Sequence, residues 1–127
     1  MSPEGIIDAS AVLRTYYAIL LGGIEKYGDG HELLPLLDDH LTFDGPVAGR
    51  VEGAARFARG VRGFIEAVRE IDFVQAVTTD DGAAVLYDAV LPNATVRFAE
   101  FFEFAGGVIK ELRIHYNAAD YAAAGGH

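Results

Sequence analysis

Three polar residues stand among apolar neighbours in this chain, and together they have the chemistry to move a proton. They are Tyr16 in LRTYYAIL, Asp44 in FDGPVAG and Glu100 in RFAEFFEF. An ionised carboxylate among the phenylalanines around Glu100 would be costly to keep dry, so we expect a raised pKa, a partner or a role in a site. A tyrosine hydroxyl, a neutral carboxylic acid and a separate carboxylate base are the groups needed for proton transfer next to a carbonyl.

Each of the three residues also has a purely structural explanation. Asp44 precedes Gly-Pro, where an aspartate commonly accepts hydrogen bonds from the backbone amides of a turn. Tyr16 would equally serve as a core tyrosine whose hydroxyl finds a nearby carbonyl. Glu100 would pair with Arg97 or Arg113 if the register of its strand slipped by one residue. The sequence leaves these alternatives open.

Composition narrows the class of protein. The chain has 127 residues, of which 51% are hydrophobic, which suits a single domain over residues 1–127 with apolar area left to line a cavity. It has no apolar run of about 20 residues and no signal-peptide pattern at its N-terminus, so we expect a cytoplasmic protein with no membrane contact. The net charge of −9 disfavours nucleic acid and favours a neutral or cationic ligand.

Metal and cofactor chemistry find no support in the residue pattern. The chain has no cysteine, and its four histidines lack the spacing of a metal-binding motif. Much of the basic charge falls in one stretch, at Arg50, Arg56, Arg59, Arg62 and Arg69. This pattern favours the solvated face of a helix over an anion site.

The order of elements predicts the fold class. Apolar residues at helical spacing predict helices, and a period of two after Glu70 predicts strands. The expected helices cover about 8–27, 31–37 and 53–69; the expected strands cover a short segment near 41–43 and then 71–79, 83–91, 95–104 and 108–117. Helices followed by an antiparallel meander predict an α+β fold with helices against one face of a curved sheet.

Alternation along the strands predicts which side chains face the helices. Phe98, Glu100 and Phe102 share one face of their strand, and Tyr87 and Leu112 belong to the more apolar faces of the neighbouring strands. Glu100 is then the one carboxylate of the meander that points inward. The opposite sheet face keeps aromatic residues such as Phe101, so we expect it to form a homodimer interface.

The chain resembles the NTF2-like superfamily, and within it the ketosteroid isomerase and SnoaL-like branch. LRTYYAIL resembles the segment that carries the isomerase's oxyanion tyrosine, which places that role on Tyr16. RFAEFFEFAGGVIKELRIHY resembles its last two strands, where Glu100 takes the place of a protonated aspartic acid. LTFDGPVAG resembles the general-base segment; aligned without a gap from Pro46 the base position falls on Gly45, and one inserted residue puts it on Asp44.

The resemblance implies a cone of three helices and a strongly bent antiparallel sheet that encloses an apolar pocket. It implies catalytic roles for Tyr16, Asp44 and Glu100 in proton transfer α to a carbonyl, on an apolar steroid, terpenoid or polyketide and without a cofactor. The alternative is a non-catalytic module of the same fold that binds a hydrophobic ligand or dimerises. The expected pocket wall comprises Tyr17, Phe57, Tyr87, Phe98, Leu112, Ile114 and Tyr116.

Overall fold

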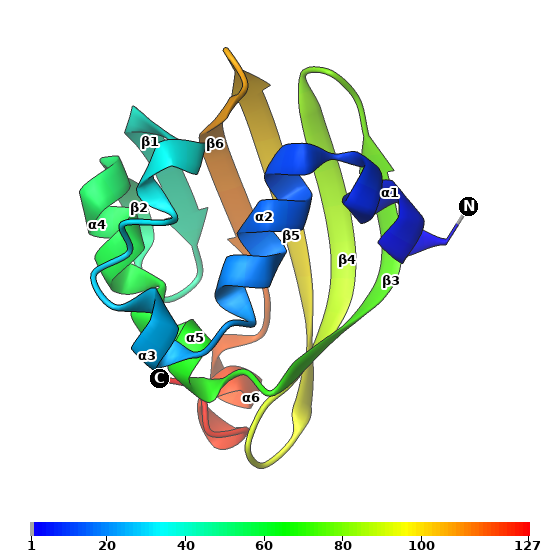
Figure 1. Cartoon of the computed structure of the whole chain (residues 1–127). Helices are drawn as coiled ribbons and strands as arrows, with labels where there is room; N and C mark the ends of the chain where they lie inside the picture. The colour runs from blue at the N-terminus through cyan, green and yellow to red at the C-terminus, as the bar shows by residue number, and fades with distance from the viewer. Residues whose placement is uncertain (1) are drawn as a thin grey trace.

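Six strands and several short helices make up the protein in a computed structural model that describes residues 2–127 (Figure 1). The helical elements are α1 (Pro3–Ala9), α2 (Ala11–Leu20), α3 (Ile24–Tyr27), the 3-10 helix η1 (Leu34–Leu36), α4 (Ala54–Gly60), α5 (Arg62–Ala67) and α6 (Ala118–Ala123). The strands are β1 (Leu37–Gly45), β2 (Gly49–Glu52), β3 (Glu70–Thr78), β4 (Gly82–Val90), β5 (Thr95–Ala105) and β6 (Val108–His115). The predicted α+β class is confirmed.

The strands form one sheet in the order β2-β1-β6-β5-β4-β3. All neighbouring pairs are antiparallel except β1 and β6, which are parallel, so the sheet is mixed where the sequence predicted a purely antiparallel one. Register shifts interrupt β1–β6, β3–β4 and β5–β6. Such irregularities bend a strand and increase its twist, and Figure 1 shows the sheet curving around α2.

The long first helix that periodicity predicted over 8–27 is divided into α2 and α3, and its first two residues are the end of α1, which begins at Pro3. Ser10 has an extended backbone that ends α1, and its hydroxyl accepts a hydrogen bond from the Leu13 amide, which caps α2. Gly23, with φ of 90°, separates α2 from α3. The break at Ser10 lets α1 pack against β3 while α2 crosses the inner face of the sheet (Figure 1).

Other boundaries differ from the sequence-based expectation in smaller ways. The helix predicted over 53–69 divides at Val61 into α4 and α5, and the helix predicted over 31–37 is only the turn η1. The loop expected after the first strand contains β2, which closes a hairpin onto β1. The helix α6 follows β6; Asn117 caps it through its side chain, and periodicity did not predict it.

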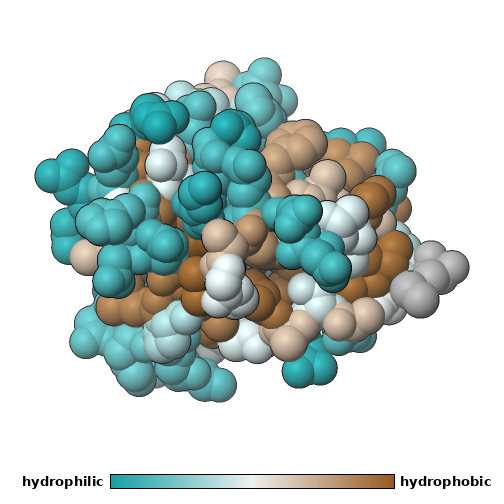
Figure 2. Space-filling model, turned by 90° about the horizontal axis from the view of Figure 1, so that it is seen from above, coloured by the Kyte–Doolittle hydropathy of each residue, from teal (hydrophilic) through white to brown (hydrophobic). Residues whose placement is uncertain are grey.

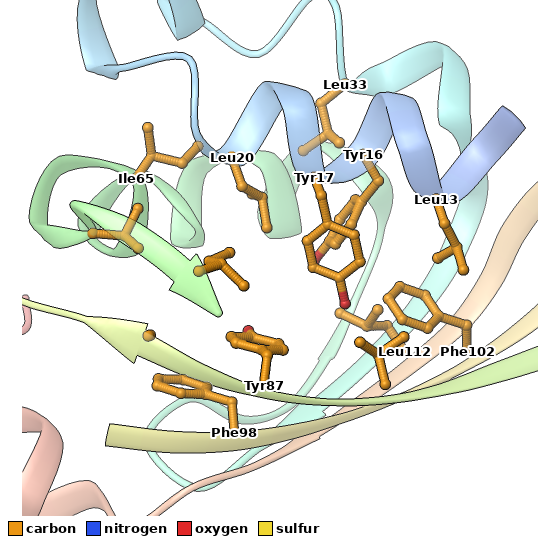
Figure 3. Packing of buried hydrophobic residues seen from close by; sticks show 14 of the residues in the cluster. Leu13, Tyr16, Tyr17, Leu20, Leu33, Ile65, Tyr87, Phe98, Phe102 and Leu112 are labelled. Carbon is orange, nitrogen blue, oxygen red and sulfur yellow. The ribbon is translucent and has the colours of Figure 1, made fainter. Parts of the chain in front are cut away.

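The core lies between the inner face of the sheet and the helices. Figure 3 shows Leu13, Tyr16, Tyr17 and Leu20 reaching from α2 toward Tyr87, Phe98, Phe102 and Leu112 on the strands. The predicted alternation on β5 holds, because Phe98, Glu100 and Phe102 are buried while Arg97, Phe101 and Glu103 are exposed. Glu100 therefore faces the helices.

The surface combines charged side chains with scattered apolar ones. Figure 2 shows mostly hydrophilic side chains on one face of the molecule, with a band of hydrophobic ones between them. On the outer side of the sheet, Phe101 is 44% exposed and Val77 is 56% exposed. A homodimer through this face stays a prediction. No helix in residues 2–127 is both long enough and apolar enough to span a membrane.

Candidate functional site

A cavity of about 150 Å³ lies between the helices and the inner face of the sheet. Its wall is largely apolar. The lining residues come from α2, α4, α5, the strands β1, β2, β4, β5 and β6, and the C-terminal segment. The lining residues are Tyr16, Leu20, Phe43, Gly45, Val47, Ala48, Val51, Arg56, Phe57, Gly60, Val61, Phe64, Tyr87, Phe98, Glu100, Leu112, Ile114, Tyr116, Tyr121 and His127.

The cavity has a buried inner end and an open rim. Glu100, Tyr16 and Tyr87 are buried at the inner end, where Glu100 is 1% exposed. The exposed lining residues form the rim, defined here as Val47, Ala48, Arg56, Gly60 and His127. A ligand that entered at the rim would meet hydrophobic walls and then one buried carboxyl group.

Two tyrosines from adjacent positions on α2 hold the Glu100 carboxyl group. The Tyr16 hydroxyl donates to Oε2 and the Tyr17 hydroxyl donates to Oε1, each at 3.0 Å. Consecutive helical residues point about 100° apart, so both reach the sheet only because α2 is buried over a wide face. Their rings meet edge to face with centroids 5.1 Å apart, which fixes the two hydroxyls beside each other.

Burial and hydrogen bonding act in opposite directions on Glu100. Burial raises the pKa of its carboxyl group from an ordinary value of 4.5 to about 6, while the hydroxyls of Tyr87, Tyr17 and Tyr16 act to lower it. The pKa values of Tyr16, Tyr17 and Tyr87 are raised, first by burial and then by the negative charge of Glu100. The tyrosines therefore stay protonated as donors, and Glu100 is the group that changes charge near neutral pH.

Glu100 does not form the alternative ion pair with Arg97 or Arg113. Arg97 pairs with Asp88, and Arg113 pairs with Glu103 and Glu111, all on the outer side of the sheet. Glu100 instead has tyrosine partners in the core. The register that places it inward runs without a break from Glu103 to Thr95, with Glu100 opposite Val85 of β4.

The structure brings Tyr16 and Glu100 together but leaves Asp44 apart from them. Asp44 is exposed and does not line the cavity, whereas its neighbours Phe43 and Gly45 do. The reason is strand alternation: Asp44 lies on β1, where successive side chains point to opposite faces. An aspartate on this face is not placed to exchange a proton with a ligand in the cavity.

Gly45 occupies the position that the gap-free alignment gives to the general base. A β-carbon built there would lie 3.0 Å from both Ile114 Cγ2 and Phe43 Cζ, which is closer than ordinary packing. The cavity wall at this position is therefore closed to a larger side chain without rearrangement. Glu100 is the only carboxylate side chain among the residues that line the cavity in the described chain, 2–127.

The predicted wall residues fall into two groups. Phe57, Tyr87, Phe98, Leu112, Ile114 and Tyr116 line the cavity. Tyr17 lies behind the wall and contacts Glu100 instead.

Sequence reasoning missed part of the wall. Tyr121 comes from α6, which follows the last predicted strand, and its ring centroid lies 5.1 Å from that of Tyr116. Phe43 and Gly45 flank Asp44, so the same alternation rule that excludes Asp44 would have indicated them. Arg56 sits in the arginine-rich stretch and gave no separate signal.

No group of three or more His, Cys, Asp or Glu side chains in the part of the chain that the structure describes is arranged to hold a metal ion. The polar side chains that line the cavity are Glu100, Tyr16 and Tyr87 at the inner end, Tyr116 and Tyr121 on the wall, and Arg56 and His127 at the rim. Such a site offers a hydrogen-bond donor or a proton acceptor at one end of an apolar ligand, depending on the charge of Glu100.

Several solved structures share this fold. A protein from Kribbella flavida DSM 17836 superimposes with a TM-score of 0.76 and 20% identity, over 91% of each chain. A Rhodopseudomonas palustris protein, provisionally assigned as an isomerase, gives 0.75 and 22% identity, over 90% of this chain and 95% of that one. A steroid delta-isomerase from Pseudomonas aeruginosa gives 0.71 and 15% identity, over 92% and 85%.

These identities are low enough that the structural likeness speaks for the fold alone. No curated protein is significantly similar to the chain in sequence. The family model described as the SnoaL-like domain, however, matches residues 13–112. That match covers most of the chain, so this protein belongs to the SnoaL-like family of the NTF2-like superfamily.

Proposed function

We propose that this protein binds an apolar small molecule through one carbonyl oxygen, which Tyr16 and neutral Glu100 contact at the inner end of the cavity. The observation that carries the proposal is the Glu100 carboxyl group, 1% exposed, tyrosine-bonded and lining an otherwise apolar wall. A core has no need of such a group, because burying a carboxyl group costs free energy that an apolar side chain would not.

The size of the cavity favours a ligand of one or two rings. An apolar cavity of about 150 Å³ is the size that holds a benzene-like molecule. A four-ring steroid would have to extend past the rim, whereas a monoterpenoid would fit largely inside. Carvone, a cyclic terpenoid enone, and limonene, its hydrocarbon parent, form a matched pair that differs by the carbonyl oxygen.

Protonation of Glu100 decides how a carbonyl is held. A carbonyl oxygen only accepts hydrogen bonds, so an ionised carboxylate repels it and a neutral carboxyl group donates to it. With the Glu100 pKa at about 6, the neutral form is abundant at pH 5 and scarce at pH 8. If only the neutral form binds, affinity for a ketone falls by up to about 100-fold between these values.

Isothermal titration of carvone and limonene at pH 5 and pH 8 tests this. We expect carvone to bind more tightly at pH 5 than at pH 8, and limonene to bind with no pH dependence. Glu100→Gln, whose amide donates at every pH, should remove the pH dependence, and Tyr16→Phe should weaken carvone while sparing limonene. Asp44→Asn is the matched acidic control and should leave both ligands unchanged.

A cavity-filling variant separates binding in the cavity from binding elsewhere. Val61 lines the cavity from the junction of α4 and α5, so Val61→Trp should weaken both ligands. Carvone binding that is indifferent to Val61→Trp and Glu100→Gln would show that the cavity is not the site. Equal pH dependence for carvone and limonene would show that Glu100 does not contact the carbonyl.

Proton transfer is the second candidate function, and it places the base on Glu100 instead of Asp44. The supporting observation is that Glu100 has a pKa of about 6 and is the carboxylate that faces the cavity among residues 2–127. Ionised Glu100 would take a proton from the carbon α to the carbonyl while Tyr16 donates to the developing enolate oxygen. The protonated acid would then return a proton to the same carbon framework.

Deuterium exchange distinguishes a protein that catalyses proton transfer from one that only binds the ligand. Carvone in D₂O exchanges its α-hydrogens slowly without a catalyst, and NMR follows the loss of signal. We expect the wild type to accelerate exchange, with the rate lost in Glu100→Gln and retained in Asp44→Asn. Exchange that requires Asp44, or no acceleration of exchange by a protein that binds carvone, would remove this candidate.

A further inference from the structure

The rim of the cavity carries a positive charge that the proposed function does not use. Arg56 lies on α4 and lines the cavity, and it is exposed. Its side chain forms no hydrogen bond or salt bridge with any residue in 2–127. An arginine side chain stays charged at all ordinary pH values and presents a planar set of donors that matches a carboxylate.

The other arginines near the helices are engaged differently. Arg62 donates to the Gly28 carbonyl, and Arg69 donates to the carbonyls of Glu66 and Ala67. Arg59 lies on the same helix as Arg56 but does not line the cavity. Arg56 therefore differs from Arg62 and Arg69 by its lack of a partner, and from Arg59 by its place on the cavity wall.

Among residues 2–127, none of the rim residues has an acidic side chain. The acidic residue of the lining is Glu100, which is buried at the inner end, and the other ionisable side chain at the rim is His127. The chain as a whole has a net charge of −9, so the positive charge of Arg56 at the mouth of the cavity is a local feature. The long-range field repels anions, and a short-range contact is what would hold one.

We propose that the ligand of this cavity carries an anionic group, such as a carboxylate, at the end opposite its carbonyl, and that Arg56 binds that group. This inference rests on the proposed function, because the carbonyl at Glu100 sets the orientation of the ligand. It names the substrate class as an apolar oxo acid, with a ketone directed inward and a carboxylate directed toward the rim. Arg56 is a specificity-determining residue in this arrangement.

Pinonic acid and its methyl ester test the inference. Both are terpenoid methyl ketones of similar size, and only the acid has a negative charge at the far end. The readout is the ratio of acid to ester affinity measured by titration calorimetry at pH 6.5, since the shared ketone cancels the contribution of Glu100. We expect the acid to bind about two- to tenfold more tightly than the ester, as for exposed or partly shielded arginine–carboxylate pairs.

Two variants assign the preference to a residue. Arg56→Gln should abolish the preference for the acid over the ester, whereas Arg59→Gln should keep that preference. Salt at 0.5 M should reduce the ratio in the wild type, because a charge contact near the surface is screened. All of these proteins should fold alike, since both arginines are exposed.

The outcomes separate this inference from the proposed function. An ester that binds and depends on Glu100, with no preference for the acid or with a preference that Arg56→Gln retains, overturns the role of Arg56 alone. An ester that binds without dependence on Glu100 contradicts the proposed function while the ratio still tests Arg56. Failure of both ligands to bind overturns the proposed oxo-acid class.

Discussion

The two faces of β5 place neighbouring residues in opposite environments. Phe98 and Glu100 point toward the helices, where each is 1% exposed. Arg97 and Phe101 point outward, where Arg97 pairs with Asp88 and Phe101 is 44% exposed. The inner face supplies both the core and the polar end of the cavity, while the outer face carries ion pairs and single exposed apolar side chains such as Phe101. A residue's parity along the strand therefore decides its role more than its chemical type does.

The same rule separates the two acidic residues that the sequence singled out. Glu100 has inward parity on β5 and is held by tyrosines, and Asp44 has outward parity on β1 and is exposed. Two carboxyl groups of the same chemistry thus differ in their hydrogen-bond partners and in their access to the cavity. If this difference in environment governs their behaviour, substitutions of the two residues should have unequal effects.

The largest expected difference is in stability between the two faces. Phe98→Ala should lower the free energy of unfolding by about 3–5 kcal/mol, because it removes a buried ring that stacks on Tyr87 at 5.3 Å. Phe101→Ala should cost less than about 1 kcal/mol, since its side chain is partly in solvent already. Urea unfolding of the two variants measures the contrast, and equal losses would contradict the assignment of faces.

Glu100 should make stability depend on pH. Its pKa is raised from 4.5 to about 6, so the folded state binds the proton more tightly than the unfolded state. Protonated Glu100 therefore stabilises the folded state below pH 4.5, and this contribution is lost as the pH rises through 6. The loss is about 2 kcal/mol, at about 1.4 kcal/mol for each pKa unit. The difference in unfolding free energy between wild type and Glu100→Gln, measured at pH 4 and pH 7.5, isolates this change. A difference that is constant with pH would mean that Glu100 titrates normally.

Tyr17 should position Glu100 from behind the cavity wall. Tyr17→Phe removes the donor to Oε1, which should cost about 1–2 kcal/mol and raise the pKa of Glu100 further above 6. A carbon-13 NMR titration of the glutamate carboxyl groups reports the pKa, and urea unfolding reports the stability. A loss of stability with no change in the pKa would indicate a packing role only.

Asp44 should show the smallest effects. Asp44→Asn is expected to change unfolding free energy by less than about 0.5 kcal/mol, because the side chain is exposed and the structure gives it no hydrogen bond within residues 2–127. Carvone affinity at pH 5 should also be unchanged within about twofold, as calorimetry can show. A large loss of unfolding free energy or of carvone affinity would show that Asp44 contributes to the site.

Periodicity predicted the fold better than it predicted the site. The four strands of the meander and the inward parity of Glu100 followed from alternation, which depends only on neighbouring residues. The break at Ser10 was missed because a capping serine does not interrupt the apolar stripe of a helix. The parallel pairing of β1 with β6 was missed because it joins segments far apart in the sequence.

The same limits explain the candidate site. Tyr16 and Glu100 were indicated by polar groups in apolar surroundings, yet Tyr17 was expected on the wall because sequence cannot say which of two adjacent tyrosines faces a cavity. Asp44 was chosen for its carboxylate, and its strand was too short in the sequence-based prediction for parity to exclude it. Arg56 and Tyr121 are identified as lining residues only by the packing of α4 and α6 around the cavity.

The pKa of the Glu100 carboxyl group, measured with and without carvone, tests most directly whether Glu100 contacts the ligand. Carbon-13 NMR of glutamate-labelled protein, with Glu100→Gln to assign the signal, gives this value in both states. We expect a pKa near 6 in the free protein and a higher pKa at saturating carvone, because the carbonyl selects neutral Glu100. A pKa that saturating carvone leaves unmoved would mean that Glu100 does not contact the ligand.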